Sequence, residues 1–430
     1  MLFSDFHTRS VVVYRIWLIF AGGISILGVP YWFNALEQGY FYTFSSLIAA
    51  QVLFELGLSF VIAQFTAHEI GSLSRALEPD NNLSRLAHLF HFSDVWFQYI
   101  AIGFLMIVGP VGYLFFIRGP ITGVDWQIPW IILVLASALN LRYGARLAMV
   151  EGTGEVGQVA QLRLIQSMLG HVLMWTVLFF GWKLWAMAMV PLFAFIVTVS
   201  WLHHHHFILA MRERIKKGLG ATIDWHRDYF PMQWRIALSW ASGYLIFQAI
   251  TPIVFVKLGP VSAGQIGLAL AIFNGVQTLG MSWMNSRAPE FGELIVRNEL
   301  AKLNALFINT FKKANTIVAL GVGIVIIGDF FLRDLNPGLA ARIPDEATLT
   351  CFGVATIVNA MIFSMALYMR CHKEEPMLAP SVIGGLLVLL GVYIGASNSI
   401  LLTAFIYMLL ACIIGLPWAW VIFNSYFQKK

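Results

Sequence analysis

The sequence is poor in charge: Asp, Glu, Lys and Arg make up 11% of its 430 residues, where a globular chain carries about 25%. It is also poor in cysteine, and its three cysteines form no CxxC pair, which argues against a disulfide framework or a paired-cysteine metal site. It contains neither a GxxxxGK[ST] phosphate loop nor an HExxH zinc motif. These absences exclude ATP hydrolysis by the chain itself and leave no sequence signal for a metalloprotease.

Apolar residues, in contrast, are abundant. They make up 59% of the chain, with 34 Phe, 15 Trp and 16 Met, and the mean hydropathy is +0.76. A soluble fold of this size has no means of burying so much apolar surface, so we predict an all-α integral membrane protein. A membrane-spanning helix needs about 20 mainly apolar residues. Twelve stretches meet this length, at 11–33, 41–65, 89–117, 128–150, 161–181, 184–208, 232–256, 263–286, 312–331, 347–370, 377–396 and 399–425.

The basic residues predict the orientation of these spans. With the N-terminus placed in the cytoplasm, 22 of the 27 Lys and Arg residues fall on the inner side. Cytoplasmic loops of membrane proteins are enriched in Lys and Arg, so both termini are predicted to be cytoplasmic. The same rule accounts for the net charge of +5 without a nucleic-acid partner.

The most basic loop divides the spans into two groups of six. We therefore predict a six-helix N-terminal lobe at 1–208, a basic cytoplasmic linker at 209–231 and a six-helix C-terminal lobe at 232–430. Two equal bundles of this kind indicate a parallel repeat, which is a common plan in transporters. The segment 289–311 is amphipathic and predicts a short helix that packs on the membrane surface.

Polar side chains deep in the bilayer mark candidate functional residues, because each costs on the order of 2.5–3.5 kcal/mol unless it faces a cavity or a partner. Glu55 lies near the middle of the span 41–65, and Gln51 lies one turn away on the same face. We predict that Glu55 is a carboxyl group that couples transport to a proton or cation, or else a polar contact to substrate. The alternative is a protonated structural Glu between helices.

A second polar feature follows one face of the span 263–286. Its members share a helical spacing and are Asn274, Gln277, Thr278, Ser282 and Asn285. Such a stripe lines water or binds neighbouring helices, and its length favours a cavity wall. In the span 161–181, His171 is either a group that titrates near neutral pH or a neutral partner between helices.

Aromatic and basic side chains are candidate contacts to a substrate head group. Trp240, Tyr244 and Gln248 align on one side of the span 232–256, and such a face suits sugar rings or lipid head groups as well as plain packing.

Four arginines near span ends are the candidate basic contacts. Arg142 and Arg146 stack at i, i+4 and suit bidentate phosphate binding, with extension toward the inner interface as the alternative. The same two interpretations apply to Arg15 and Arg287.

No metal site, cofactor or catalytic residue is predicted. The run His203 to His206 invites a metal hypothesis, but only His203 and His206 share a helical face, and no nearby Cys, Asp or Glu completes a tetrahedral set. Paired acid and base groups are also lacking, so the sequence does not predict an enzyme.

Two segments carry a resemblance to a known family. LEQGYFYTFSSLIAAQVLFELGLSFVIAQFTAHE at Leu36 to Glu69 and RAPEFGELI at Arg287 to Ile295 resemble the multidrug/oligosaccharidyl-lipid/polysaccharide (MOP) exporter superfamily, in its bacterial polysaccharide and O-antigen flippase (Wzx-like) branch. The resemblance implies two bundles around a cavity that opens alternately to each side. It also implies a polyprenyl-diphosphate-linked sugar as substrate, with Arg15, Arg142, Arg146 and Arg287 as candidate counter-charges.

The main expectation is therefore a flippase for a lipid-linked oligosaccharide in the bacterial inner membrane, serving surface polysaccharide export. Its expected partners are the glycan lipid, membrane lipid, a coupling proton or sodium ion, and other polysaccharide-assembly proteins. A cation-coupled small-molecule exporter of the same superfamily and a non-transporting scaffold of a glycan-synthesis complex are the alternatives.

Overall fold

The computed structural model of the chain describes residues 6–73, 79–119, 123–217, 230–372 and 375–429. Within these ranges the secondary structure is helical, with no β-strand. A helix satisfies all its backbone hydrogen bonds internally, which a segment surrounded by lipid requires. The predicted all-α membrane fold is confirmed, and the chain is a multi-pass membrane protein.

Eleven helices in the described ranges are long and apolar enough to cross a bilayer, and a bent pair brings the number to twelve. The bent pair joins Ala35–Glu55 to Leu58–Gly71 at an angle of 42°. The bend follows from the backbone: Leu56 and Gly57 have φ values of 50° and 71°, in the left-handed region that ends a helix. The number of spans agrees with the prediction, and the cytoplasmic placement of the termini stays a prediction.

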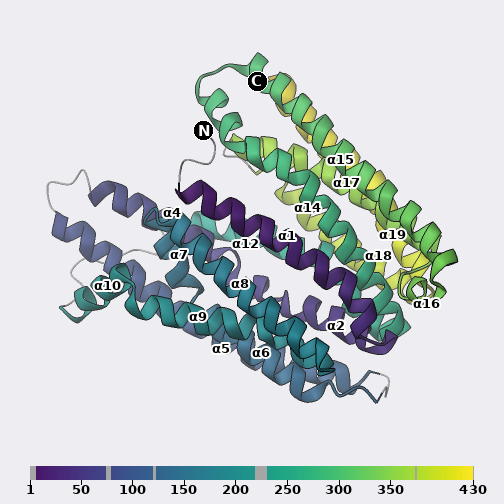
Figure 1. Cartoon of the computed structure of the whole chain (residues 1–430). Coiled ribbons are helices and arrows are strands. Elements are labelled where there is room, and N and C mark those ends of the chain that lie inside the picture. Colours follow the sequence, from purple (N-terminus) through teal and green to yellow (C-terminus); the bar gives the residue numbers. More distant parts are fainter. Residues whose placement is uncertain (1–5, 74–78, 120–122, 218–229, 373–374, 430) are drawn as a thin grey trace. The chain divides into compact units, whose positions relative to one another are not determined.

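The chain forms two compact units, of which the first comprises Met1–Ser25 and Leu47–Ala241. In this unit α8 and α9 lie side by side, as do α5 and α6 (Figure 1). Its helices are the first part of α1 (Phe6–Trp32), α3 (Gln51–Glu55), α4 (Leu58–Leu73), α5 (Pro79–Ile117), α6 (Gln127–Arg142), α7 (Gly144–Gly152), α8 (Val156–Phe179), the 3-10 helix η1 (Lys183–Ala188), α9 (Met189–His204), α10 (His206–Lys216) and the first part of α12 (Phe230–Phe247).

The second unit comprises Ile26–Ser46 and Ser242–Lys430. Here α14, α15 and α17 pack against one another along their length (Figure 1). Its helices are the last part of α1, α2 (Ala35–Ile48), the last part of α12, α13 (Ile250–Leu258), α14 (Pro260–Val296), α15 (Leu300–Leu335), α16 (Pro337–Ala340), α17 (Glu346–Cys371), α18 (Leu378–Gly395), α19 (Ile400–Leu409), the π-helical segment η2 (Leu410–Gly415) and α20 (Leu416–Lys429).

The two units differ from the predicted lobes 1–208 and 232–430, because residues 26–46 pack with the second unit. The amide Nε2 of Gln38 donates to the carbonyl oxygens of Gly264 (2.9 Å) and Arg342 (3.1 Å). Gly39 lies so close to the backbone of Pro260 that a Cβ there would overlap it. The predicted linker 209–231 includes residues 218–229, which lie outside the described residues.

The predicted surface helix at 289–311 is wrong. Instead, α14 continues to Val296 and α15 begins at Leu300. At about 1.5 Å per residue, helices of 37 and 36 residues are longer than the roughly 30 Å apolar core of a bilayer. Their apolar residues Phe291 and Phe307 pack with Tyr368 and Phe423 in a buried cluster, so the amphipathic pattern reflects helix packing.

Candidate functional site

A polar cavity of about 520 Å³ lies within the second unit, between the junction of α12 and α13, α14 and α17. Its lining residues are Phe247, Gln248, Asn274, Gln277, Thr278, Met281, Asn285, Phe363, Leu367 and Arg370. Pockets that hold small ligands measure about 300–1,000 Å³, so this cavity is large enough for a ligand.

Four of the five residues of the helical stripe on α14 line this cavity, and Ser282 does not. Asn274, Gln277, Thr278 and Asn285 recur at a spacing that places them on one side of the helix. Gln248, in the turn between α12 and α13, lines the same cavity. The structure thus brings together three of the predicted site residues: Gln248, Asn274 and Gln277.

Gln277 is the buried member of the lining. Its side chain is 8% exposed, and its Nε2 has no hydrogen-bond partner among the described residues. A buried donor without a partner costs about 1–3 kcal/mol, and nearly all buried polar groups in proteins are paired. The amide is therefore available to donate a hydrogen bond to a group that enters the cavity.

The charge of the lining is the second property that restricts its ligands. Among the described residues that line the cavity none is acidic, and the one charged side chain is Arg370. Arg370 is exposed, with its Nε 3.7 Å from Oε1 of Glu375. Sequence reasoning missed Arg370, which lies at the end of a predicted span and shows no pattern with other residues.

Gln51 and Glu55 belong to the first unit, on the short helix α3. Both side chains are half-buried, and Glu55 ends α3 directly before the left-handed Leu56 and Gly57. The described part of the chain offers Glu55 no hydrogen bond or ion pair. The predicted coupling carboxyl thus lies at the break of a bent span.

The basic pair Arg142 and Arg146 has a partner that the sequence analysis missed. Asp94 on α5 accepts from Nη1 and Nη2 of Arg142 at 2.8 and 3.0 Å, and from Nε and Nη2 of Arg146 at 2.7 and 3.0 Å. Asp94 lies near the start of a predicted span, and an acid in that place is by default a functional or paired group. That signal was present in the sequence.

Arg146 and Asp94 also line a cavity of about 370 Å³ in the first unit. The helix α10 supplies Arg212, Glu213 and Lys216 to the same cavity. Lys216 Nζ lies 3.1 Å from Oε1 of Glu213, so two of its basic groups already have carboxylate partners.

The other two predicted arginines differ in their surroundings. Arg287 is exposed and pairs with Glu290 one turn along α14, at 2.6 Å between Nη1 and Oε2. Arg15 is exposed on α1, and its guanidinium has no carboxylate partner among the described residues.

The aromatic pair of α12 is divided between the units, because the boundary lies between Ala241 and Ser242. Trp240, in the first unit, is exposed. Tyr244, in the second, donates its hydroxyl to the carbonyl of Ser46 at 3.3 Å. Neither residue lines the polar cavity of the second unit.

His171 forms its hydrogen bonds within its own helix. Its Nδ1 lies 2.8 Å from the carbonyl oxygen and 3.2 Å from the hydroxyl of Ser167 on α8. The Ser167 hydroxyl in turn accepts from Nε1 of Trp17 on α1 at 3.0 Å. These contacts favour the interpretation of His171 as a neutral partner at a helix contact, and its role stays a prediction.

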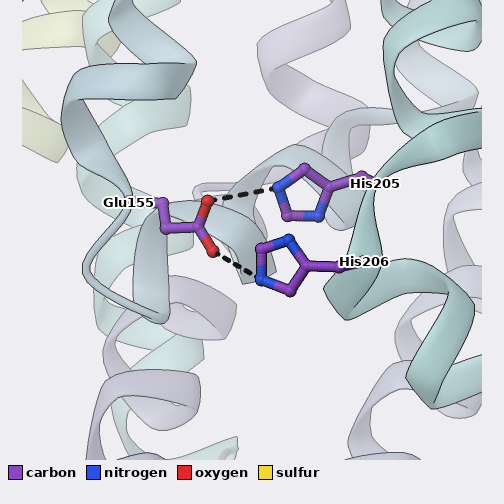
Figure 2. A group of neighbouring side chains, drawn as sticks. All are labelled: Glu155, His205 and His206. Atoms are coloured by element: carbon purple, nitrogen blue, oxygen red, sulfur yellow. Dashed lines mark hydrogen bonds and ion pairs between the residues drawn. The ribbon is translucent and has the colours of Figure 1, made fainter.

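The histidine run has an acidic neighbour, contrary to the prediction that none completes a set. Figure 2 shows both oxygens of Glu155 engaged, one by His205 and one by His206. The Nε2–oxygen distances are 3.2 and 3.3 Å. Burial lowers the pKa of His205 from its ordinary value, and the nearby Glu155 carboxylate opposes that shift. The acid is 50 residues away in the chain, which is why the local sequence pattern did not show it.

The chain matches no protein-family model and no curated protein, but solved structures match its fold. An inward-facing multidrug resistance transporter of the MATE family, in the MOP superfamily, has a TM-score of 0.69 at 13% identity, over 95% of this chain and 99% of that chain. A MOP superfamily transporter from Pyrococcus furiosus, whose binding pocket is described as having reverse polarity, has a TM-score of 0.56 at 15% identity. The match covers 100% of this chain and 98% of that chain. The lipid II flippase MurJ, in an inward closed conformation, has a TM-score of 0.53 at 12% identity, over 97% and 89%.

At these identities the likeness shows the fold, which is that of the solved MOP superfamily transporters. The chain's assignment to the polysaccharide-flippase branch stays a prediction.

Proposed function

We propose that the protein is a transporter that moves a polyprenyl-diphosphate-linked oligosaccharide across the bacterial inner membrane by alternating access. The observation that carries this proposal is the lining of the cavity in the second unit. Four of its polar side chains, Gln248, Asn274, Gln277 and Asn285, are amides, and its described lining contains no carboxylate.

An amide-rich lining suits a sugar. Each amide side chain offers two N–H donors and a carbonyl acceptor, and sugar hydroxyl groups both donate and accept. The unpartnered Nε2 of Gln277 is the donor for which a sugar oxygen provides the missing acceptor. The rings of Phe247 and Phe363 in the same lining give the apolar faces on which sugar rings pack.

The diphosphate needs cationic contacts. Arg370 is the basic residue among the described lining of the polar cavity in the second unit. Of the four arginines that the resemblance suggested, Arg142 and Arg146 share Asp94, and Arg287 is paired with Glu290. Arg15 has no carboxylate partner among the described residues, and we propose it and Arg370 as the first two candidate head-group contacts to test.

A cation-coupled exporter of small molecules is the second candidate. The similar structures include a multidrug resistance transporter of this fold. Glu55 favours a coupling ion, because a half-buried carboxylate that has no partner among the described residues can exchange a proton or Na⁺. The acid-free cavity of the second unit counts against a cationic drug as substrate, since a buried cation requires a paired charge.

A ligand-binding experiment separates these candidates. The purified protein in detergent is titrated with a fluorescent polyprenyl-diphosphate oligosaccharide and, separately, with a cationic dye. The proposal expects saturable binding of the glycan lipid that weakens about ten-fold in Gln277→Leu, equal to one hydrogen bond of about 1.4 kcal/mol. Binding of the cationic dye alone would favour the exporter. A glycan lipid that binds and yet is never translocated would favour the non-transporting scaffold.

A further inference from the structure

Three metal-ligating side chains meet at one end of the first unit. Glu155 is the residue that precedes α8, and His205 and His206 lie where α9 ends and α10 begins (Figure 2). They meet because the backbone leaves the helix at His205, with φ −73° and ψ 122°. In a continuous helix, successive residues point about 100° apart, whereas the extended His205 lets both rings face Glu155.

Both histidine nitrogens lie close to the carboxylate, each to a different oxygen of Glu155. One oxygen of Glu155 lies 3.2 Å from His205 Nε2, and the other lies 3.3 Å from His206 Nε2. With metal–ligand bonds of about 2.0–2.1 Å, neighbouring ligands of a tetrahedral Zn²⁺ are about 3.3 Å apart. One ligand atom from each residue lies within 4.8 Å of the others, so the three side chains are close enough to share one ion.

The environment of the two rings also suits coordination. His205 is 6% exposed, and its Nδ1 has no hydrogen-bond partner in the part of the chain that the structure describes. When Nε2 coordinates an ion, its contact with Glu155 is replaced by a bond to the metal, and the ring proton lies on Nδ1. The His206 side chain is 77% exposed, which gives an ion a route of entry and leaves a coordination position for water.

We infer that Glu155, His205 and His206 form a binding site for Zn²⁺. Two imidazoles and one carboxylate are the donor set that Zn²⁺ takes in open sites, with water as the fourth ligand, while Mg²⁺ and Ca²⁺ prefer oxygen donors alone. A bound ion ties the start of α8 to the junction of α9 and α10.

Zinc titration of the purified full-length protein tests this inference. The wild-type chain is expected to bind one Zn²⁺ per chain in competition with a chromogenic chelator, and Zn²⁺ is expected to raise its unfolding temperature. Loss of an outer-shell contact weakens metal sites by about 10–100-fold, so loss of a ligand in His206→Ala or Glu155→Gln is expected to cost at least about ten-fold in affinity.

The controls separate a built site from a histidine run that chelates metal without a fixed structure. His203 and His204 are exposed neighbours outside the cluster, and His204→Ala is expected to leave the affinity unchanged. Glu155→Gln keeps the size of the side chain and lies far from the run in sequence. Zinc affinity that falls in His204→Ala as much as in His206→Ala, or that survives Glu155→Gln, would overturn the inference.

Discussion

Arg146 on α7 donates from Nε to Oδ1 of Asp94 on α5 over 2.7 Å, and this contact joins two helices of the first unit. Arg142, at the end of α6, binds both oxygens of the same carboxylate. The two guanidinium groups also lie over the ring of Tyr143, at 5.8 and 4.9 Å from its centre. Asp94 is thus the shared anion that allows two arginines to lie close together.

Asp94→Asn is expected to destabilise the first unit. Without the carboxylate, two largely buried guanidinium groups repel each other, and removal of one partner of a buried ion pair typically costs about 3 kcal/mol or more. A lower unfolding temperature of the purified protein checks this. Glu290→Gln is the matched control: it breaks the exposed pair with Arg287 and is expected to leave the temperature unchanged. Equal effects of the two substitutions would contradict the role given to Asp94.

Gly39→Ala is expected to destabilise the second unit. A Cβ at this position would overlap the carbonyl group of Pro260, and such overpacking costs about 1–3 kcal/mol. Gly23→Ala is the control, because no neighbouring atom lies within 4 Å of its added Cβ and alanine favours a helix. The unfolding temperature should therefore fall in Gly39→Ala and stay unchanged in Gly23→Ala. A Gly39→Ala protein as stable as the wild type would mean that α2 does not need this close approach.

The cavity lining predicts different effects for two substitutions on α14. Asn274→Leu removes an amide from the lining and is expected to slow glycan-lipid transport about ten-fold, by loss of about 1.4 kcal/mol of hydrogen bonding. Ser282 lies on the same helix, but its hydroxyl donates to the carbonyl of Leu279 and it does not line the cavity. Ser282→Ala should transport at the wild-type rate, and an equal loss in both variants would argue against a specific sugar contact.

Glu55 predicts how transport responds to a proton gradient. Glu55→Gln keeps the size and hydrogen bonding of the side chain but removes its titratable group, so transport in proteoliposomes should become independent of the gradient. If Glu55→Gln retains gradient-dependent transport and Glu55→Leu does not transport, Glu55 is a polar contact. If both variants behave like the wild type, its predicted role is wrong.

The parts of the fold that depend on local composition were predictable from the sequence. Lipid requires long apolar helices, so hydropathy alone predicted the all-α class and the twelve spans. The packing of residues 26–46 with the second unit was not predictable from the sequence. It involves close contacts between distant segments, such as that of Gly39 with the backbone of Pro260. The amphipathic pattern at 289–311 was misassigned for a related reason. A helix that lies on the membrane surface and a helix that packs on a neighbouring helix have apolar residues at the same spacing, so the pattern alone does not distinguish them.

In the candidate site, too, local patterns were predictable from the sequence and contacts between distant segments were not. A helical stripe on one span was visible, and Asn274 and Gln277 do line one cavity. Contacts between distant segments were not visible: Asp94 reaches Arg142 across 48 positions, and Glu155 reaches His205 across 50. A single sequence does not show which distant residues pair. In the structure, three of the four candidate arginines and two histidines of the run have carboxylate partners.

The most direct test of the central claim is lipid translocation in proteoliposomes. A labelled polyprenyl-diphosphate oligosaccharide is placed in one leaflet, and access of an external enzyme or quencher to its sugar is followed over time. We expect the protein to move the sugar to the opposite side, faster than protein-free liposomes do and more slowly in Gln277→Leu. Failure to move any such lipid, together with export of small cations from the same liposomes, would contradict the account.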